Sequence, residues 1–218
     1  MGLARVGRLP SLRGSALVIK VLIAEDQAMF RSAIKRLLEM EGDIAFVGEV
    51  GRGDQVVEAA LRTAPDVVLL DIEMPGLDGL AAAQELTDRV PSCRSLIVTT
   101  FARPGFLQRA MTSGASGFVL KDDPPEALAA AIRRCARGEK VIDPELATAA
   151  IRLGPSPLTD REREVLQATA SGATVEQISE HLHLSEGTVR NKISVAISKL
   201  NARNRVDAVR IADANGWL

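Results

Sequence analysis

The sequence predicts a doubly wound α/β domain followed by an all-helical domain. From residue 18 to about residue 137, short β-branched runs alternate with helix-length amphipathic segments. Five strand–helix units in series imply right-handed crossovers and a parallel sheet covered on both faces. After residue 157 the strand signal stops and four helical segments follow. The chain has 218 residues, which is enough for these two domains.

The strands of the first domain are expected at 19–24, 44–50, 66–70, 95–100 and 117–120. Each precedes a segment with apolar residues at helical spacing; after the first strand these are Ile34, Leu37 and Leu38. Between residues 138 and 157 the pattern weakens. We interpret this stretch as a linker that contains a short helix starting at Asp143 and ends in the break "GPSP".

The second domain, residues 158–218, is expected to contain helices at about 160–170, 175–182, 186–200 and 204–214. Thr159 is followed three residues later by Glu162, the pattern of a capping box at a helix start. Ser185 is a small polar residue placed to cap the third of these helices.

Composition indicates a soluble globular protein with reduced thiols. Apolar residues make up 46% and charged residues 25%, the formal net charge is -1, and no apolar run approaches the roughly 18 residues that span a bilayer. Cys93 and Cys135 lack metal-ligand spacing. We expect a cytoplasmic protein without a membrane partner, and any polyanionic partner must bind a local patch of charge.

The first 17 residues contain three arginines and no acid, and they lack the apolar core of a signal peptide. We expect a disordered tail. The alternative is that the natural start lies near Val18, where the first strand pattern begins, and that the preceding segment does not belong to the native protein.

Polar residues follow the ends of several expected strands. Glu25 and Asp26 follow the first strand, Asp71 the third and Lys121 the fifth, and Thr99 lies at the end of the fourth. In doubly wound folds the carboxyl ends of the strands form the ligand site. Taken singly, each residue has an ordinary explanation as a solvated turn, a helix cap or a surface lysine. Their conjunction favours a site.

Three carboxylates at one sheet edge must either take up protons or attract a cation. An oxygen-only cluster with room for water suits Mg²⁺. Lys121 adds a mobile positive charge and Thr99 a hydroxyl donor. These groups would neutralise and position a phosphoryl group at the Asp71 carboxylate.

Residues 18–137 resemble the receiver domain of bacterial two-component response regulators. The matching motifs are "AED" at 24–26, "LLDIEMPGLDG" at 69–79, "IVTTF" at 97–101 and "GASGFVLKDD" at 114–123. The resemblance implies a flavodoxin-like, five-stranded sheet. It also implies that Asp71 accepts a phosphoryl group from a sensor histidine kinase.

The same resemblance assigns roles to the surrounding residues. Glu25, Asp26 and Asp71 would hold Mg²⁺ together with the backbone carbonyl of Glu73, and Lys121 would pair with the phosphoryl oxygens. Thr99 and Phe118 would form the switch pair. Glu25 stands where Asp is frequent in the family, so its metal contact would run through water. Phe118 replaces a frequent Tyr, so its part in the switch would rest on packing.

Charge in the second domain is separated along the chain. Residues 158–185 hold two basic and five acidic residues, a net charge of -3, whereas residues 186–205 hold five basic residues and one acid, a net charge of +4. On the 186–200 helix the apolar residues share one side at helical spacing and are expected in the core: Val189, Ile193, Ala196, Ile197 and Leu200.

The opposite side of this helix carries Arg190, Asn191, Ser194 and Ser198. Arginine and asparagine can read guanine and adenine in the major groove of DNA. Lys192 and Lys199 flank that side, where they are placed for phosphate contacts. For an isolated Arg–Asn pair, an ordinary solvated helix face would be the better explanation.

Residues 158 to about 212 resemble the LuxR-type helix-turn-helix domain of the NarL/FixJ family. The matching segments include "LTDREREVL" and "LHLSEGTVRNKIS". "GTVRN" and the terminal "GWL" look most like regulators related to DesR. The resemblance implies that Arg190, Asn191 and Ser194, with Thr188 in the same motif, face double-stranded DNA and that the last helix forms a dimer contact.

The sequence therefore predicts a response regulator that dimerises on phosphorylation and binds DNA. It is not expected to be an enzyme. Two alternatives remain at this point: a DNA-binding regulator whose receiver is not phosphorylated, and an Asp-nucleophile phosphatase of the haloacid dehalogenase type. Such phosphatases place an aspartate two residues after the nucleophile, where this chain has Glu73.

Overall fold

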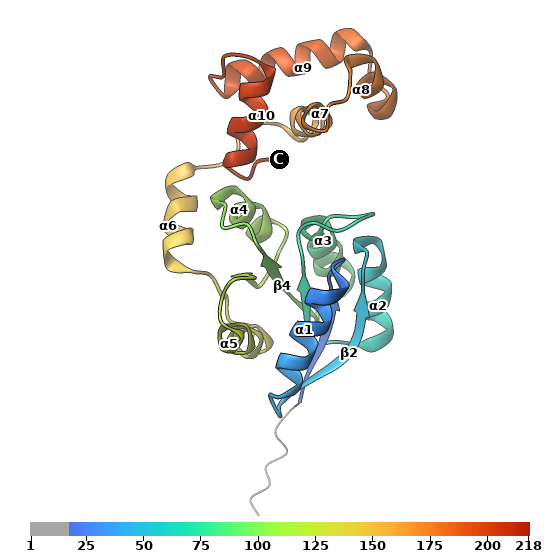
Figure 1. Ribbon diagram of the computed structural model, residues 1–218, viewed down its shortest axis with the longest axis vertical. Helices are drawn as coiled ribbons and strands as arrows, with labels where there is room; N and C mark the ends of the chain where they lie inside the picture. The colour runs from blue at the N-terminus through green and yellow to red at the C-terminus, as the bar shows by residue number, and fades with distance from the viewer. Residues whose placement is uncertain (1–17) are drawn as a thin grey trace, which may run out of the picture.

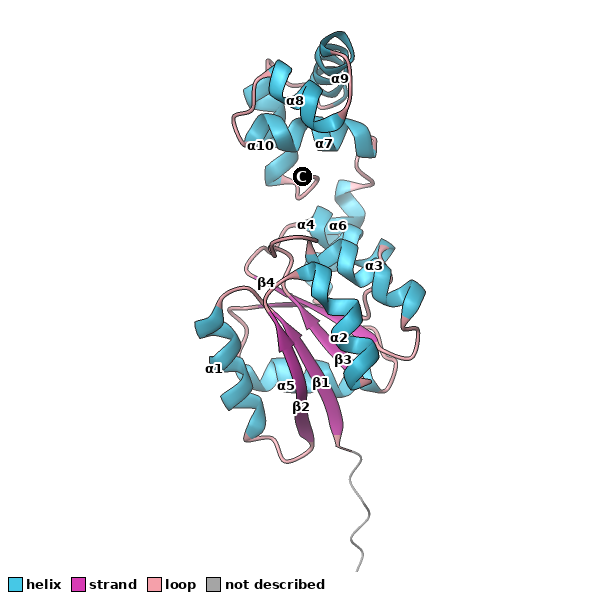
Figure 2. Cartoon of the chain, turned by 90° about the vertical axis from the view of Figure 1, so that its right-hand side faces the viewer, coloured by secondary structure: helices cyan, strands magenta, loops and turns pink. Residues whose placement is uncertain are grey.

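The structure, a computed structural model, describes residues 18–218, so the expectations for residues 1–17 lie outside the described residues. Its sheet contains five strands, which pair in parallel in the order β2-β1-β3-β4-β5. Figure 2 shows the sheet lying between helices. The strands are β1 (Ile19–Ala24), β2 (Ile44–Val50), β3 (Val67–Leu70), β4 (Arg94–Thr99) and β5 (Gly117–Leu120).

Five helices and one short 3₁₀ turn connect and cover the strands. They are α1 (Ala28–Glu39), η1 (Gly53–Gln55), α2 (Val56–Thr63), α3 (Gly79–Arg89), α4 (Pro104–Thr112) and α5 (Pro125–Ala136). Residues of α1 and α5 pack in one apolar cluster, and residues of α2, α3 and α4 pack in another. The two clusters occupy opposite faces of the sheet, which confirms the doubly wound prediction.

The strand residues alternate between these two clusters, as the pleat of a strand requires. In β1, Val21 and Ile23 pack with α1 and α5, whereas Leu22 and Ala24 pack on the other face. All four side chains are at most 3% exposed. This two-sided burial explains why the central strands are almost continuously apolar until they reach their carboxyl ends.

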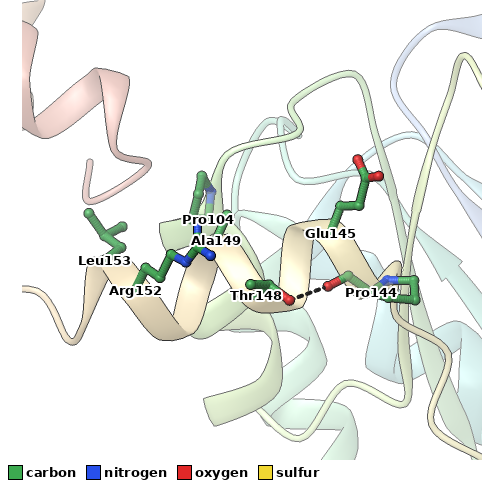
Figure 3. A pocket seen from close by; sticks show the side chains of 7 residues that line it. All are labelled: Pro104, Pro144, Glu145, Thr148, Ala149, Arg152 and Leu153. Carbon is green, nitrogen blue, oxygen red and sulfur yellow. Dashed lines mark hydrogen bonds between the residues drawn. The ribbon is translucent and has the colours of Figure 1, made fainter.

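The segment expected as a linker forms α6 (Pro144–Leu153), a helix that packs on the first domain. Asp143 caps it by accepting a hydrogen bond from the amide of Leu146. Ala150 is buried with the receiver core, and Gln108 of α4 donates to the carbonyls of Ala150 and Gly154 at 2.6 and 2.8 Å. Figure 3 shows α6 beside Pro104, at the start of α4. Gly154, the first residue of the expected break after the helix, is therefore bonded to α4.

The C-terminal domain consists of α7 (Asp160–Ala170), α8 (Val175–Leu182), α9 (Glu186–Lys199) and α10 (Arg205–Ala214). The Thr159–Glu162 capping box and the Ser185 cap are both present, as predicted. A second capping box, formed by Thr174 and Gln177, was not predicted. The last helix starts at Arg205, because Asn204 is its cap and accepts a hydrogen bond from the amide of Asp207.

The two domains touch where α4 meets the C-terminal end of α10. Figure 1 marks the C-terminus beside this contact. Arg103 Nη1 lies 2.6 Å from Asp213 Oδ1 and also donates to the Asp213 carbonyl. The amide of Gly105 donates to the Asn215 carbonyl at 2.9 Å. A side chain at Gly105 would collide with that carbonyl, so the close approach requires glycine there.

Both cysteines are buried and free, which agrees with the expectation of reduced thiols. Burial raises the pKa of Cys93 to about 12 and that of Cys135 to about 11. Both thiols therefore remain protonated at neutral pH. Among residues 18–218, none of the helices has the length and apolar character required to cross a bilayer.

Candidate functional site

The carboxyl edge of the sheet brings together most of the predicted acid site. Lys121 Nζ lies 2.7 Å from Glu25 Oε2 and 3.0 Å from Asp71 Oδ2. The three side chains are only 4–6% exposed. Asp26 is exposed, and one carboxylate oxygen from each of Glu25, Asp26 and Asp71 lies within 4.8 Å of the others. The lysine thus bridges two buried acids, and a third acid lies at the solvent side.

Strand pairing fixes the positions of these residues. The amide of Asp71 donates to the Ala24 carbonyl at 3.0 Å, which holds the end of β3 beside the end of β1. The amide of Lys121 donates to the Thr99 carbonyl at 2.8 Å, which holds the end of β5 beside β4. The sheet order places β1 and β4 on either side of β3. Asp71 is therefore central, and its partners approach from both sides.

Negative charge is in excess at this edge. Loss of hydration on burial raises the pKa values of Glu25 and Asp71, although the hydrogen bonds from Lys121 oppose the rise. For Lys121, burial alone would lower the pKa, but its hydrogen bonds to Glu25 and Asp71 outweigh burial and raise it. One ammonium is thus too little positive charge for the acids around it. The three carboxylate donors fit a hard divalent cation, which prefers oxygen ligands.

The predicted switch residues lie on adjacent strands, and Thr99 is bonded through its carbonyl to Lys121 of this site. Thr99 is fully buried and Phe118 is 3% exposed in the cluster that contains α4. The Thr99 hydroxyl accepts a hydrogen bond from the amide of Phe101 at 3.3 Å. The guanidinium of Arg103 lies 4.8 Å from the centre of the Phe101 ring. These contacts connect the end of β4 with the residue that bonds to α10.

The Glu73 side chain is exposed. Its predicted role uses only the backbone carbonyl, and that role stays a prediction.

The C-terminal domain offers an open polar surface on α9, at the top of Figure 1. Arg190, Asn191 and Ser194 are exposed, while Val189, Ile193 and Ala196 are at most 9% exposed in the core.

Arg190 has a partner on its own helix, since its guanidinium lies 2.7 Å from Glu186 Oε2. Its side chain is nevertheless 66% exposed. Thr188 is half-buried and its hydroxyl lies 2.9 Å from that of Ser185, at the start of the helix. Lys192 is half-buried. The helix therefore packs through its apolar side and leaves an Arg–Asn–Ser face available to a ligand.

Comparison with known proteins identifies two families of domain in the chain. Residues 21–133 match the response regulator receiver domain, and residues 156–212 match the luxR family of bacterial regulatory proteins. The chain belongs to the response regulators of two-component systems. Within that family its fold and domain order are those of the NarL/FixJ type, as the sequence predicted.

Relatives of this response regulator align over nearly their whole length. The transcriptional regulatory proteins YvfU, described as uncharacterised, and DesR, both of Bacillus subtilis (strain 168), are 45% and 44% identical to it. Each alignment covers 92% of this chain and 100% or 99% of the relative. A solved RcsB–DNA complex is 25% identical, with a TM-score of 0.61, and the match covers 90% of this chain and 98% of RcsB.

Lys199 of this response regulator bonds to a buried glutamate of its own domain. Its Nζ lies 2.7 Å from Oε2 of Glu162, whose side chain is 4% exposed. Burial would raise the Glu162 pKa, but the bonds from Lys199 and Thr159 outweigh burial and lower it. Lys199 thus ties α9 to the capping box of α7. The predicted contact between Lys199 and a DNA phosphate stays a prediction. For that contact, either the bond to Glu162 would have to loosen or the exposed third of the Lys199 side chain would have to reach the phosphate.

Sequence reasoning missed one neighbour of the acid site. The ring of Phe30, on the first turn of α1, lies with its centre 4.5 Å from Lys121 Nζ. In the sequence Phe30 has the spacing of an ordinary core residue that precedes Ile34 by four positions. Spacing alone gives no sign that its ring meets a cation.

Proposed function

We propose that this chain is a phosphorylation-controlled, DNA-binding transcriptional regulator whose phosphoryl acceptor is Asp71. The observation that carries the proposal is the Lys121 bridge: a buried ammonium within 3.0 Å of the Asp71 carboxylate, inside a cluster of three acids. The cognate donor would be a sensor histidine kinase. The chain would act in the cytoplasm as a regulator and not as a turnover enzyme.

In the proposed reaction an Asp71 carboxylate oxygen attacks phosphorus, and the bond from phosphorus to the donor atom breaks. The donor leaves with the electron pair of that bond. Lys121 would turn from the carboxylate to the new phosphoryl oxygens and offset their charge. Glu25, Asp26, Asp71 and the Glu73 backbone carbonyl would hold Mg²⁺, which supplies charge neutralisation when bound.

Thr99 and Phe118 are the proposed switch residues. The Thr99 hydroxyl would donate to a phosphoryl oxygen, and Phe118 would repack in the space this opens. Phe101 and Arg103 connect Thr99 with Asp213 of α10, and they offer a route by which the change reaches the C-terminal domain. The outcome would be a shift in a pre-existing equilibrium toward a homodimer.

Each protomer of that dimer would place α9 in the major groove of double-stranded DNA. Arg190, Asn191 and Ser194, with Thr188, would face base edges, and Lys192 and Lys199 would face phosphates. The complex of the related RcsB with DNA supports this use of the luxR-type domain. Two domains joined in a dimer would bind paired half-sites about 10 bp apart more tightly than one domain alone.

The test uses the full chain with Mg²⁺ and acetyl phosphate, followed by intact mass measurement. We expect the wild type to gain the mass of one phosphoryl group and the Asp71→Asn variant to gain none. Asp66→Asn is the matched control, since Asp66 flanks the same strand at its other end and should leave the gain intact. An equal gain in Asp71→Asn contradicts the proposal, and so does steady turnover of an aryl phosphate.

A further inference from the structure

Lys121 has a partner in addition to its two carboxylates. An ammonium group has three N–H donors, and the bonds to Glu25 and Asp71 occupy two of them. The Phe30 ring centre lies 4.5 Å from Nζ, well inside the range of about 6 Å over which a ring face attracts a cation. The Lys121 side chain is 6% exposed, so this attraction acts on an ammonium that has lost most of its water.

The backbone around Phe30 holds the ring in place. Arg31, the next residue, donates from its guanidinium to the carbonyl of Glu25. The amide of Arg31 also bonds to the Gln27 carbonyl at 3.0 Å, which closes the first turn of α1. The start of α1 is thereby fastened to the end of β1. The Phe30 ring lines the small cavity beside Glu25 and Asp71 on one side and the groove between α1 and α5 on the other.

A neutral ring suits a lysine that has to change partners. A further carboxylate at the position of Phe30 would add negative charge to a cluster that already has too much, and it would compete with the phosphoryl oxygens for the ammonium. An aliphatic side chain would exclude water but would not attract the cation. The face of an aromatic ring attracts the ammonium without adding a formal charge.

We propose that Phe30 is a positioning residue for phosphoryl transfer, and that its ring face holds the Lys121 ammonium against Asp71. The inference rests on the proposed phosphorylation of Asp71. It adds that the reaction depends on a π surface contributed by α1. In this arrangement the ring keeps Lys121 at the site both before transfer and while the lysine moves to the phosphoryl oxygens.

The first measurement needs neither metal nor phosphate. Protons attached to the Lys121 Cε and Nζ should resonate upfield in NMR spectra, because they lie over the Phe30 ring face. Phe30→Leu should remove that shift and Phe30→Tyr should retain it. If the Lys121 shift is the same in wild type and Phe30→Leu, the ring does not hold the ammonium and the proposal is overturned.

The second measurement is the initial rate of mass gain with acetyl phosphate and Mg²⁺. We expect Phe30→Leu to react about 3- to 30-fold more slowly, the range between an exposed and a desolvated cation–ring contact, and Phe30→Tyr to restore the rate. Phe46→Leu is the matched control: Phe46, on the edge strand β2, packs against the same apolar cluster as Phe30. The Phe46→Leu variant should lose about as much thermal stability as Phe30→Leu and keep the wild-type rate of mass gain.

The outcomes separate the two proposals. If Phe30→Leu reacts at the wild-type rate, the positioning role is overturned while phosphorylation of Asp71 stands. If the wild type gains no mass, both proposals are overturned. Should Phe30→Leu not fold, Phe30→Met removes the ring with a more flexible apolar side chain that adapts to the site, and it carries the same comparison.

Discussion

Each domain contains buried carboxylates held by cations, yet their pKa values shift in opposite directions. In the receiver, burial raises the pKa values of Glu25 and Asp71 in spite of their shared lysine. In the C-terminal domain, bonds from Arg203 and Arg210 hold the Asp207 pKa well below its usual range. Glu162, bound by Lys199 and Thr159, is also shifted downward.

The difference lies in the ratio of charges. At the receiver edge two buried carboxylates share one ammonium and a third carboxylate lies nearby, whereas Asp207 has two guanidinium groups and a backbone amide to itself. The second arrangement stabilises the ionised acid and fastens α10 to the preceding turn. The first leaves negative charge without a partner, which is a favourable setting for a divalent cation and a costly one for the metal-free fold.

Replacing the lysine that bonds to a buried acid in each domain should separate these two roles most clearly. Lys121→Met is expected to slow phosphorylation by acetyl phosphate about 100-fold, since loss of one fixed donor to a developing charge costs about that much. Lys199→Met removes the other lysine that bonds to a buried acid and should leave the rate unchanged. Intact mass measured over time reports both rates. Equal rates in wild type and Lys121→Met would place the lysine outside the reaction.

On the exposed face of α9, a substitution should change DNA affinity without changing thermal stability. Arg190→Ala should weaken binding to a specific operator by roughly 10- to 100-fold, the typical value of one bidentate base contact. Its Tm should remain that of the wild type, because exposed ion pairs of this kind contribute little. The control is Arg62→Ala, an exposed arginine with the same spacing to a glutamate on α2. Unchanged affinity of Arg190→Ala, measured by fluorescence anisotropy, would exclude base contact.

Neutral replacements of the two glutamates should shift thermal stability in opposite directions. Burial raises the pKa of Glu25, so Glu25→Gln removes a charge whose burial costs stability, and its Tm at pH 7.5 without divalent cations should rise by a few degrees. Glu162→Gln removes the ionised form that Lys199 and Thr159 stabilise, so its Tm should fall by a similar amount. Differential scanning calorimetry checks both. A fall in both variants would mean that Lys121 fully compensates the receiver acids.

The dependence on pH follows from the same shifts. For Glu25 and Asp71 the folded pKa is raised, so stability declines as pH rises from their ordinary values of 4.5 and 3.8 through the raised folded values. For Glu162 the folded pKa is lowered, so its contribution is present above 4.5 and is lost as pH falls through the folded value. Glu25→Gln should therefore flatten the decline above pH 4.5. Glu162→Gln should flatten the loss below it.

Much of this comparison was accessible from the sequence, for identifiable reasons. Glu25, Asp71 and Lys121 could be predicted to converge because parallel strands bring their carboxyl ends to one edge. Strand and helix ends followed from apolar patterning, and the Thr159 cap followed from local spacing. These signals lie within a few residues of one another, so they need no knowledge of how helices pack.

Contacts that depend on packing between elements were not accessible. Phe30 meets Lys121 only because α1 is seated at a particular angle on the sheet. Lys199 turns toward Glu162 because α9 crosses α7, although its position on the helix suggested a phosphate contact. The segment interpreted as a linker packs on α4 through Ala150, a residue whose helical pattern did not reveal its partner.

The contact between the domains should give the smallest effect, because it combines one ion pair with close backbone packing. Gly105→Ala would place a side chain against the Asn215 carbonyl and should detach the end of α10 from α4. Trp217, the only tryptophan of the chain, lies at this junction with a buried indole nitrogen. Its emission should shift to the red as the domains separate, while the Tm of the receiver should change little.

Gly42→Ala is the matched control, because a side chain at Gly42 would meet no neighbouring atom within 4 Å. It should leave the Trp217 emission unchanged. Arg103→Ala should give a weaker version of the Gly105→Ala shift, since its bond to Asp213 is partly exposed and such pairs contribute about 0.2–1 kcal/mol. If Gly105→Ala leaves the emission at the wild-type wavelength, then α4 does not hold α10 in solution. The route from Thr99 through Arg103 would then have to act after the domains separate.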